Sequence, residues 1–168
     1  LGSGFENGDE IKIIISDEQD ELLDTGGGIR HATRSFKKPF VAINPDTLWS
    51  NAYYKELKDL EDFFFEEKKP CLLLVKKELS FDNSFKGDFN LNNGVISKDN
   101  HNEFIFTGLQ ILDKSVFGSI KDKIFSMNRI WNNLIKENSL IGSESKQKFY
   151  HLNTKEMYDK ILSLKITH

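Results

Sequence analysis

An aspartate near a predicted strand end is the side chain in this sequence whose chemistry is easiest to connect to a ligand. Asp46 follows the apolar run 40–43 in the tetrapeptide Asn-Pro-Asp-Thr. Open α/β sheets bind ligands beyond the carboxyl ends of parallel strands, and carboxylate oxygens are ligands that Mg²⁺ prefers. We therefore predict that Asp46 is a catalytic metal ligand for Mg²⁺. The same tetrapeptide is also typical of a turn that caps a helix.

Three consecutive glycines form the second candidate. Thr25 precedes Gly26, Gly27 and Gly28. A backbone without Cβ atoms can approach a ligand closely, so we predict a loop that lies against a base or sugar. The alternative is a flexible connection between a strand and a helix. No Gly-Lys-Ser/Thr follows and the G-x-G-x-x-G spacing is absent, which excludes a P-loop and a dinucleotide fingerprint.

The remaining candidates are a second acidic residue and the histidines. Asp88, between Gly87 and Phe89, could accept hydrogen bonds from a sugar, although a turn acid before a strand has the same pattern. The sequence contains no H-E-x-x-H motif, and no histidine has a local Ser/Asp partner signature. The histidines therefore give no support for a hydrolase triad.

The elements that must position these residues alternate in the first half of the chain. Strands are predicted at residues 11–16, 40–43 and 71–76, with helices at 28–36 and 53–64. Alternating strands and helices indicate a parallel sheet with right-handed crossovers. The second half differs, because its shorter strands could be partly antiparallel. It has predicted strands at 89–91, 95–97, 104–112 and 149–152, a helix at 127–137, and a final helix capped by Thr154.

Composition excludes several classes of protein. The 168 residues carry a net charge of -3, which argues against a general nucleic-acid binder. No apolar stretch approaches the roughly 18 residues of a membrane span. Cys71 is the single cysteine, so no internal disulfide can form. We expect one domain over residues 1–168, located in the cytoplasm, with neither a nucleic-acid nor a membrane partner.

Two segments together carry a resemblance to a known family. Residues 21–29 read Glu-Leu-Leu-Asp-Thr-Gly-Gly-Gly-Ile, and residues 39–49 read Pro-Phe-Val-Ala-Ile-Asn-Pro-Asp-Thr-Leu-Trp. In this order and separation they resemble the centre of the bacterial sugar-1-phosphate nucleotidyltransferases. The closest subgroup is the N-acetylmuramate-α-1-phosphate uridylyltransferases and mannose-1-phosphate guanylyltransferase-like proteins. The likeness continues at residues 87–89 and 106–108 and becomes thinner toward the end.

The resemblance implies a fold and a reaction. The fold would be a mixed, Rossmann-like nucleotidyltransferase sheet, represented by its carboxyl-terminal part and lacking the first strand and phosphate loop. The reaction would join UTP or GTP to a sugar 1-phosphate and release pyrophosphate, in cell-wall recycling or sugar-nucleotide metabolism. Asp46 would hold Mg²⁺ and residues 25–28 would line the base and sugar. Asn44, Asp88 and Gly108 would lie on the sugar-phosphate side.

Departures from the family pattern keep a second interpretation open. The family's Gly-x-Gly-Thr-Arg loop is absent from these 168 residues, Pro45 replaces a glycine beside Asp46, and His151 stands at the family's second metal-binding aspartate. The competing hypothesis is an inactive remnant or a non-enzymatic binding module of the same fold. A generic doubly wound binding domain unrelated to sugars would require the motif order to be a coincidence. An incomplete sheet would also leave an edge for self-association.

Overall fold

The computed structural model describes residues 13–18 and 21–164. The strands form one mixed sheet in the order β1-β5-β2-β6-β4-β3. Their bounds are β1 Phe40–Ile43, β2 Cys71–Lys76, β3 Asn90–Asn92, β4 Val95–Ser97, β5 Phe104–Leu112 and β6 Ile141–Ser145. The helices are α1 Asp24–Ala32, α2 Tyr53–Glu67, α3 Met127–Lys136 and α4 Lys155–Ser163, with short 3-10 turns η1 Lys77–Leu79 and η2 Lys114–Phe117.

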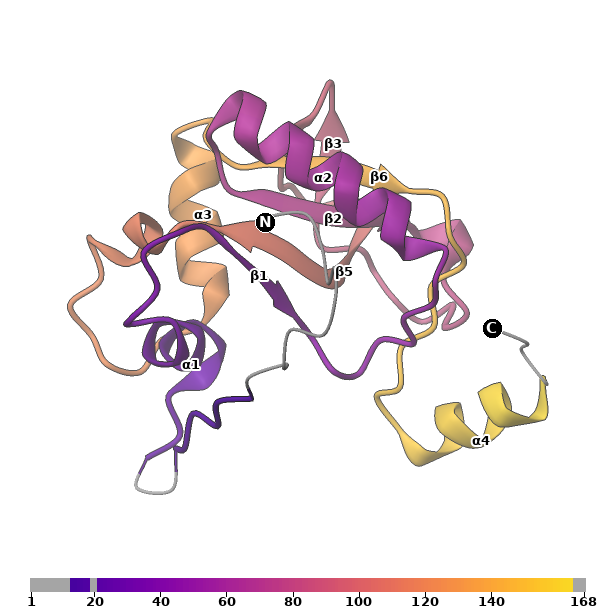
Figure 1. Ribbon diagram of the computed structural model, residues 1–168. Helices are drawn as coiled ribbons and strands as arrows, with labels where there is room; N and C mark the ends of the chain where they lie inside the picture. The colour runs from indigo at the N-terminus through magenta and orange to yellow at the C-terminus, as the bar shows by residue number, and fades with distance from the viewer. Residues whose placement is uncertain (1–12, 19–20, 165–168) are drawn as a thin grey trace, which may run out of the picture.

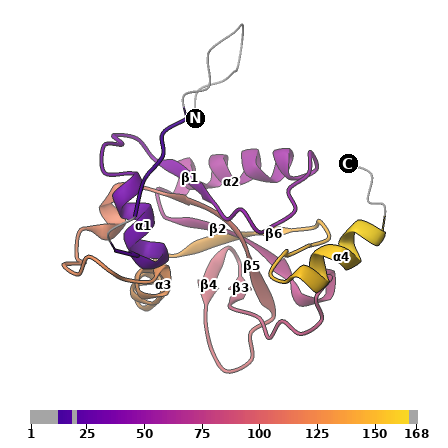
Figure 2. The same cartoon turned by 90° about the horizontal axis from the view of Figure 1, so that it is seen from below.

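Helices cover both faces of the sheet, and α1 and α4 lie toward opposite ends of the molecule in both views (Figures 1 and 2). The α2 helix packs on one face through Leu60 and Phe64, which meet Leu73 of β2. Ile130 and Trp131 of α3 pack on the opposite face. The β2 strand, Cys-Leu-Leu-Leu-Val-Lys, is buried on both faces because each face has a helix over it.

The expectation of a parallel sheet holds only in part. β1 and β2 run in the same direction, but β5 lies between them and pairs with both antiparallel. Among the described strands, only β2 and β6 are parallel neighbours. The hairpin of β3 and β4 adds a further antiparallel edge. The sheet is therefore mixed, as the family resemblance predicted.

The first predicted strand is wrong where the structure describes it. Residues 13–16 form no regular element, and the side chains of Ile13, Ile14 and Ile15 are 83%, 71% and 87% exposed. Residues 11 and 12 lie outside the described part of the chain. A β-branched run favours a strand only where a neighbouring strand can pair with it, and none does here.

The glycine loop is also wrong, because all three glycines belong to α1. The N–H groups of Gly26 and Gly27 donate to the Phe125 carbonyl at 2.9 and 3.0 Å. A Cβ atom on Gly26 would lie 2.4 Å from the Phe125 ring, and one on Gly27 would lie 2.5 Å from the Lys123 carbonyl oxygen. The glycines thus let α1 pack closely on the segment before α3.

Two differences concern the end of the chain. The predicted strand at 149–152 does not join the sheet as a strand, although Phe149 and His151 each make an isolated bridge. Strand β6 has the polar sequence Ile-Gly-Ser-Glu-Ser and was not predicted. The final helix begins as expected, because the Thr154 hydroxyl accepts a hydrogen bond from the Met157 N–H at 3.1 Å.

Candidate functional site

Three chain segments meet beyond the carboxyl ends of β1, β2 and β6. Residues 149–152 run between the segment that follows β1 and the segment that follows η1. On one side Leu48 N donates to the Tyr150 carbonyl at 2.9 Å, and Leu152 N donates to the Asp46 carbonyl at 2.6 Å. On the other side the N–H of Phe81 donates to the Phe149 carbonyl at 2.8 Å. This convergence brings the predicted site residues of distant segments to one edge of the sheet.

Asp46 and His151 meet in this arrangement, as expected for two residues that the resemblance aligns with the family's metal positions. Oδ2 of Asp46 lies 3.1 Å from Nε2 of His151. The imidazole ring stacks on Phe149, with centroids 6.0 Å apart, and contacts the Phe85 ring edge to face. The other acceptor, Asp46 Oδ1, and the other ring nitrogen, His151 Nδ1, are buried and have no hydrogen-bond partner in the described part of the chain. The pair is ordered but incompletely satisfied.

Asn44 and Gly108 form the adjoining wall. The Asn44 N–H donates to the Gly108 carbonyl at 2.8 Å, and the Trp49 indole N–H donates to the Asn44 carbonyl at 3.0 Å. Gly108 has φ +94°, and a Cβ atom there would lie 2.7 Å from Cβ of Asn44. Glycine is therefore required at 108 both for its backbone conformation and for the contact with Asn44.

Asp88 contacts strand β5 at Phe106, two residues before Gly108. Its Oδ2 atom accepts a hydrogen bond from the Phe106 N–H at 2.9 Å, and its own N–H donates to the Phe104 carbonyl at 2.7 Å. The carboxylate of Asp88 therefore positions β5 beside Gly108. This is the structural role of a turn acid, although its other oxygen can still accept a hydrogen bond.

Glu56 of α2 fixes the turn that leads from β6 to the candidate site, and sequence reasoning missed it. Its carboxylate accepts hydrogen bonds from the Ser145 hydroxyl at 2.7 Å, the Lys146 N–H at 2.9 Å and the Gln147 side-chain amide at 3.3 Å. In sequence, Glu56 is one of many acids on an amphipathic helix, so no local signal distinguishes it.

Comparison with known proteins shows which proteins this chain resembles. No family model matches the chain. It is 26% identical over 137 residues to the N-acetylmuramate alpha-1-phosphate uridylyltransferase of Caulobacter vibrioides, covering 78% of this chain and 57% of that protein. The chain thus spans little more than half the length of this curated relative.

Solved structures agree on the fold. The inositol-1-phosphate CTP transferase from T. maritima superposes with a TM-score of 0.66 at 13% identity, over 84% of this chain and 61% of that one. A UDP-glucose pyrophosphorylase complexed with UDP-glucose gives 0.64 at 17% identity, over 86% and 63%. The chain resembles the sugar-1-phosphate nucleotidyltransferases and shares their fold. The predicted fold class and family resemblance are therefore confirmed.

The nucleotidyltransferase fold does not bring every predicted site residue into direct contact. Gly26 and Gly27 contact the segment before α3, and the Thr25 hydroxyl accepts from the N–H of Met127, the first residue of α3, at 3.0 Å. Asn44 and Asp46 instead lie beyond β1, near the segment that leads to α4. The base-binding role predicted for residues 25–28 remains a prediction. The backbone of Gly26 and Gly27 is buried and already engaged with Phe125, whereas Thr25 is exposed and Gly28 is partly exposed.

The donor set beyond β1 supplies one of the two carboxylates that the resemblance implied for Mg²⁺. Mg²⁺ prefers oxygen ligands, which Asp46 can supply, but the neighbouring donor is the imidazole of His151. Residues 13–18 and 21–164 contain no group of three or more His, Cys, Asp or Glu side chains able to hold a metal. A Mg²⁺ ion would depend on one carboxylate and its own waters.

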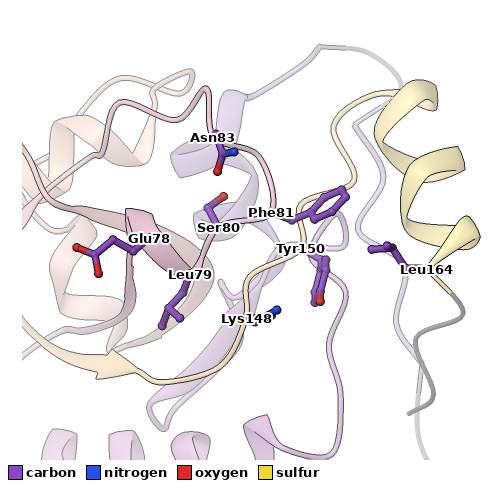
Figure 3. Close-up of a pocket in the computed structure, with 8 residues that line it drawn as sticks. All are labelled: Glu78, Leu79, Ser80, Phe81, Asn83, Lys148, Tyr150 and Leu164. Carbon is purple, nitrogen blue, oxygen red and sulfur yellow. The ribbon is translucent and has the colours of Figure 1, made fainter.

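A separate hollow lies on the other side of residues 149–151. Its volume is about 550 Å³, and it is lined by Glu78, Leu79, Ser80, Phe81, Asn83, Lys148, Tyr150 and Leu164. Figure 3 shows the Phe81 and Tyr150 rings beside each other with Leu164 of the C-terminal segment next to them. Side chains alternate along an extended segment, so Tyr150 faces this hollow while Phe149 and His151 face away from it.

Proposed function

We propose that this chain forms the sugar-phosphate side of a sugar-1-phosphate nucleotidyltransferase. The reaction would transfer a uridylyl or guanylyl group from UTP or GTP to a sugar 1-phosphate and release pyrophosphate. The observation that supports this best is the meeting of Asn44, Asp46 and Gly108 beyond β1. Open α/β folds bind their ligands at this edge of the sheet.

The proposed reaction requires the protein to position the two substrates and does not require a nucleophilic side chain. An oxygen of the sugar 1-phosphate attacks the α-phosphorus, and the bond from that phosphorus to the pyrophosphate oxygen breaks. Holding the two phosphates in line supplies most of the catalysis. In this proposal the side-chain amide of the exposed Asn44, which lies beside the buried Gly108, binds the sugar phosphate, and Asp88 keeps β5 in place. Residues 25–28 serve the base. Mg²⁺ at Asp46 stays a prediction of the resemblance, and no step here depends on it.

A non-catalytic binding module remains the second candidate. Imidazole in place of a second carboxylate favours it, as does the lack of a Gly-x-Gly-Thr-Arg segment in these 168 residues. Removing one preorganised donor typically costs about 10²–10³ in rate, so lacking the whole phosphate grip would abolish turnover. Pyrophosphate release from UTP or GTP with a panel of sugar 1-phosphates by this chain alone would rule out the binding module, whereas its absence agrees with both candidates. We predict no turnover by the 168-residue chain alone.

The proposed function also indicates where the protein acts and which nucleotide should be tested first. No helix in the described ranges 13–18 and 21–164 is long and apolar enough to cross a membrane. Nucleotide sugars are made from cytoplasmic precursors in the proposed metabolism, so we propose the cytoplasm as the site of action. The relative from Caulobacter vibrioides is named for uridylyl transfer. That name favours UTP over GTP as the first nucleotide to test.

Direct binding of a nucleotide sugar tests the proposal without requiring turnover. We expect calorimetry to detect binding of a UDP-sugar or a GDP-sugar. Asn44→Ala should weaken it about tenfold, the equivalent of one lost hydrogen bond of ~1.4 kcal/mol. Asn51→Ala is the matched control, because Asn51 is exposed before α2 and should leave affinity unchanged. Failure of every nucleotide sugar to bind the folded chain would contradict the proposal.

A further inference from the structure

The separate hollow beside residues 149–151 has a wall of two aromatic rings that the backbone holds in place. The ring centroids of Phe81 and Tyr150 lie 5.5 Å apart, and the ring planes are tilted by 39°. The Phe81 N–H donates to the Phe149 carbonyl at 2.8 Å, and the Phe149 N–H donates to the Leu79 carbonyl at 2.9 Å. The two segments that carry the rings are therefore paired, and a wall that is ordered in advance loses little entropy when a ligand binds.

The size and lining of this hollow are those of a small-molecule site. Its volume of about 550 Å³ lies within the range of roughly 300–1,000 Å³ that is typical of ligand pockets. Leu164 adds an apolar side chain next to the two rings (Figure 3). Ligand pockets combine apolar and aromatic surface with a small number of polar groups, and the hollow has both.

Three polar side chains of the lining are available to a ligand. Glu78, Asn83 and Lys148 are exposed, and their side chains form no hydrogen bond or ion pair with any residue in the ranges 13–18 and 21–164. A carboxylate supplies acceptors, an ammonium group supplies donors, and an amide supplies both. Since the single acid and the single base cancel in charge, the lining does not attract a polyanion.

This combination of groups indicates the chemical class of the ligand. A hexopyranose ring has a face of C–H groups that packs on an aromatic ring, and its hydroxyl groups each donate and accept hydrogen bonds. A nucleotide could also stack its base on the rings, but its phosphates would have one lysine to offset their charge and a carboxylate to repel them. We propose that the hollow binds a neutral saccharide, with one sugar ring against Phe81 and Tyr150. The sugar hydroxyls bind Glu78, Asn83 and Lys148.

This saccharide site goes beyond the proposed function and is separate from it. In the proposed function the sugar 1-phosphate binds at Asn44, beyond β1. Tyr150 faces the hollow, whereas the neighbouring Phe149 and His151 side chains, which stack on each other, face away from it. The two sites use different residues, so either proposal can fail while the other stands.

Amide chemical shifts of the ¹⁵N-labelled full chain test the proposal directly. The chain would be titrated with glucose, mannose and N-acetylglucosamine at millimolar concentrations. We expect at least one sugar to give saturable shifts centred on residues 78–83 and 148–150, with nuclear Overhauser contacts from the sugar C–H protons to the Phe81 or Tyr150 ring. Tripolyphosphate, a polyanion without a ring, is the ligand control and should leave these residues unshifted.

Two variants identify the groups that bind the sugar. Tyr150→Leu removes the ring but keeps an apolar side chain, so the affinity should fall about tenfold. Tyr54→Leu is its control, because Tyr54 is 66% exposed on α2 and lies outside the hollow lining.

The second variant, Asn83→Ala, should lower the affinity about threefold to tenfold through the loss of one hydrogen-bonding side chain. Asn83 is exposed and bonds to no described side chain, so this variant should remain folded even if Tyr150→Leu does not. Asn51→Ala, exposed before α2, is its control. Thermal unfolding would establish that each variant is folded.

Any of three results would overturn the proposal. The first is the absence of shifts in the hollow with all three sugars, or sugar-induced shifts centred elsewhere. The second is binding of tripolyphosphate in the hollow more tightly than any of the sugars. The third is an equal loss of affinity in the control variants and in the variants of the hollow.

Discussion

Thr47 and His151 pair across an isolated antiparallel bridge, and this pairing brings Asp46 to the imidazole. The Thr47 hydroxyl also donates to the Thr107 carbonyl at 2.8 Å, which ties the bridge to β5. The candidate site is therefore held by backbone pairing between segments that lie outside the main sheet. Substitutions that disturb these supports should alter the site without touching Asp46 or His151.

Gly108 should tolerate no Cβ atom. In Gly108→Ala the new Cβ would lie 2.7 Å from Cβ of Asn44, at a backbone φ of +94°. We predict a loss of ~1–3 kcal/mol in the free energy of unfolding, measured by chemical denaturation. Gly118→Ala is the control, since Gly118 has φ −59° and should change stability by less than ~0.5 kcal/mol. Equal effects of the two substitutions would contradict this account.

Glu56 should stabilise the turn that carries residues 149–152. Glu56→Gln removes the charge that accepts hydrogen bonds from Ser145, Lys146 and Gln147. We predict a loss of ~1–3 kcal/mol in unfolding free energy, together with faster amide hydrogen exchange in residues 145–151. Asp59→Asn disrupts only an exposed pair with Lys55 on the same helix, so a change below ~0.5 kcal/mol is expected. Unchanged exchange in Glu56→Gln would show that the turn does not depend on this carboxylate.

Cys71 should be unreactive in the folded protein. Burial raises the pKa of the Cys71 thiol to about 12, with a smaller contribution from Glu67. The neutral thiol therefore favours the folded state fully below the ordinary pKa of 9.0, and this stabilisation is lost as pH rises toward the folded value. We predict that a thiol reagent labels Cys71 at pH 8 only at the rate of unfolding. Rapid labelling without denaturant would contradict the burial of this residue.

The outer edge of β1 should promote self-association. Among the described strands β1 pairs only with β5, and the side chain of Ile43 on this edge is 50% exposed. Unpaired edges invite pairing with another chain, and an inserted lysine opposes it. We predict concentration-dependent association in sedimentation velocity that Ile43→Lys reduces. Val95→Lys, at an exposed residue of β4, should not reduce it. A wild-type monomer across the accessible concentration range would contradict the prediction.

Much of the architecture was predictable because periodic apolar residues report their burial. The spacing of Tyr53, Leu57, Leu60 and Phe64 predicted α2, and the run from Cys71 predicted β2. Strand β6 was missed because its residues are small and polar. Gly142 has no side chain to signal burial, yet a Cβ atom there would lie 2.8 Å from Ile96 Cδ1. Long-range packing, which the local sequence does not encode, makes this segment a strand.

The contact between Asp46 and His151 could be predicted from the sequence, whereas the structure of the glycine run could not. The contact of Asp46 with His151 could be expected from the resemblance, since both occupy positions of family metal ligands. The glycines gave the opposite result, because a Gly-Gly-Gly run predicts flexibility while close packing on Phe125 makes it helical. A glycine run can form a flexible loop or a closely packed helix, and only the neighbours of Gly26 and Gly27 decide which of the two forms here.

The most direct test of the central claim is an amide chemical-shift map of the ¹⁵N-labelled chain titrated with a UDP-sugar. The account predicts saturable shifts centred on Asn44, Asp46 and Gly108, which Asn44→Ala weakens and Asn51→Ala does not. Shifts confined to the hollow lined by Glu78, Phe81 and Tyr150, or no shifts at millimolar ligand, would contradict a sugar-phosphate site beyond β1.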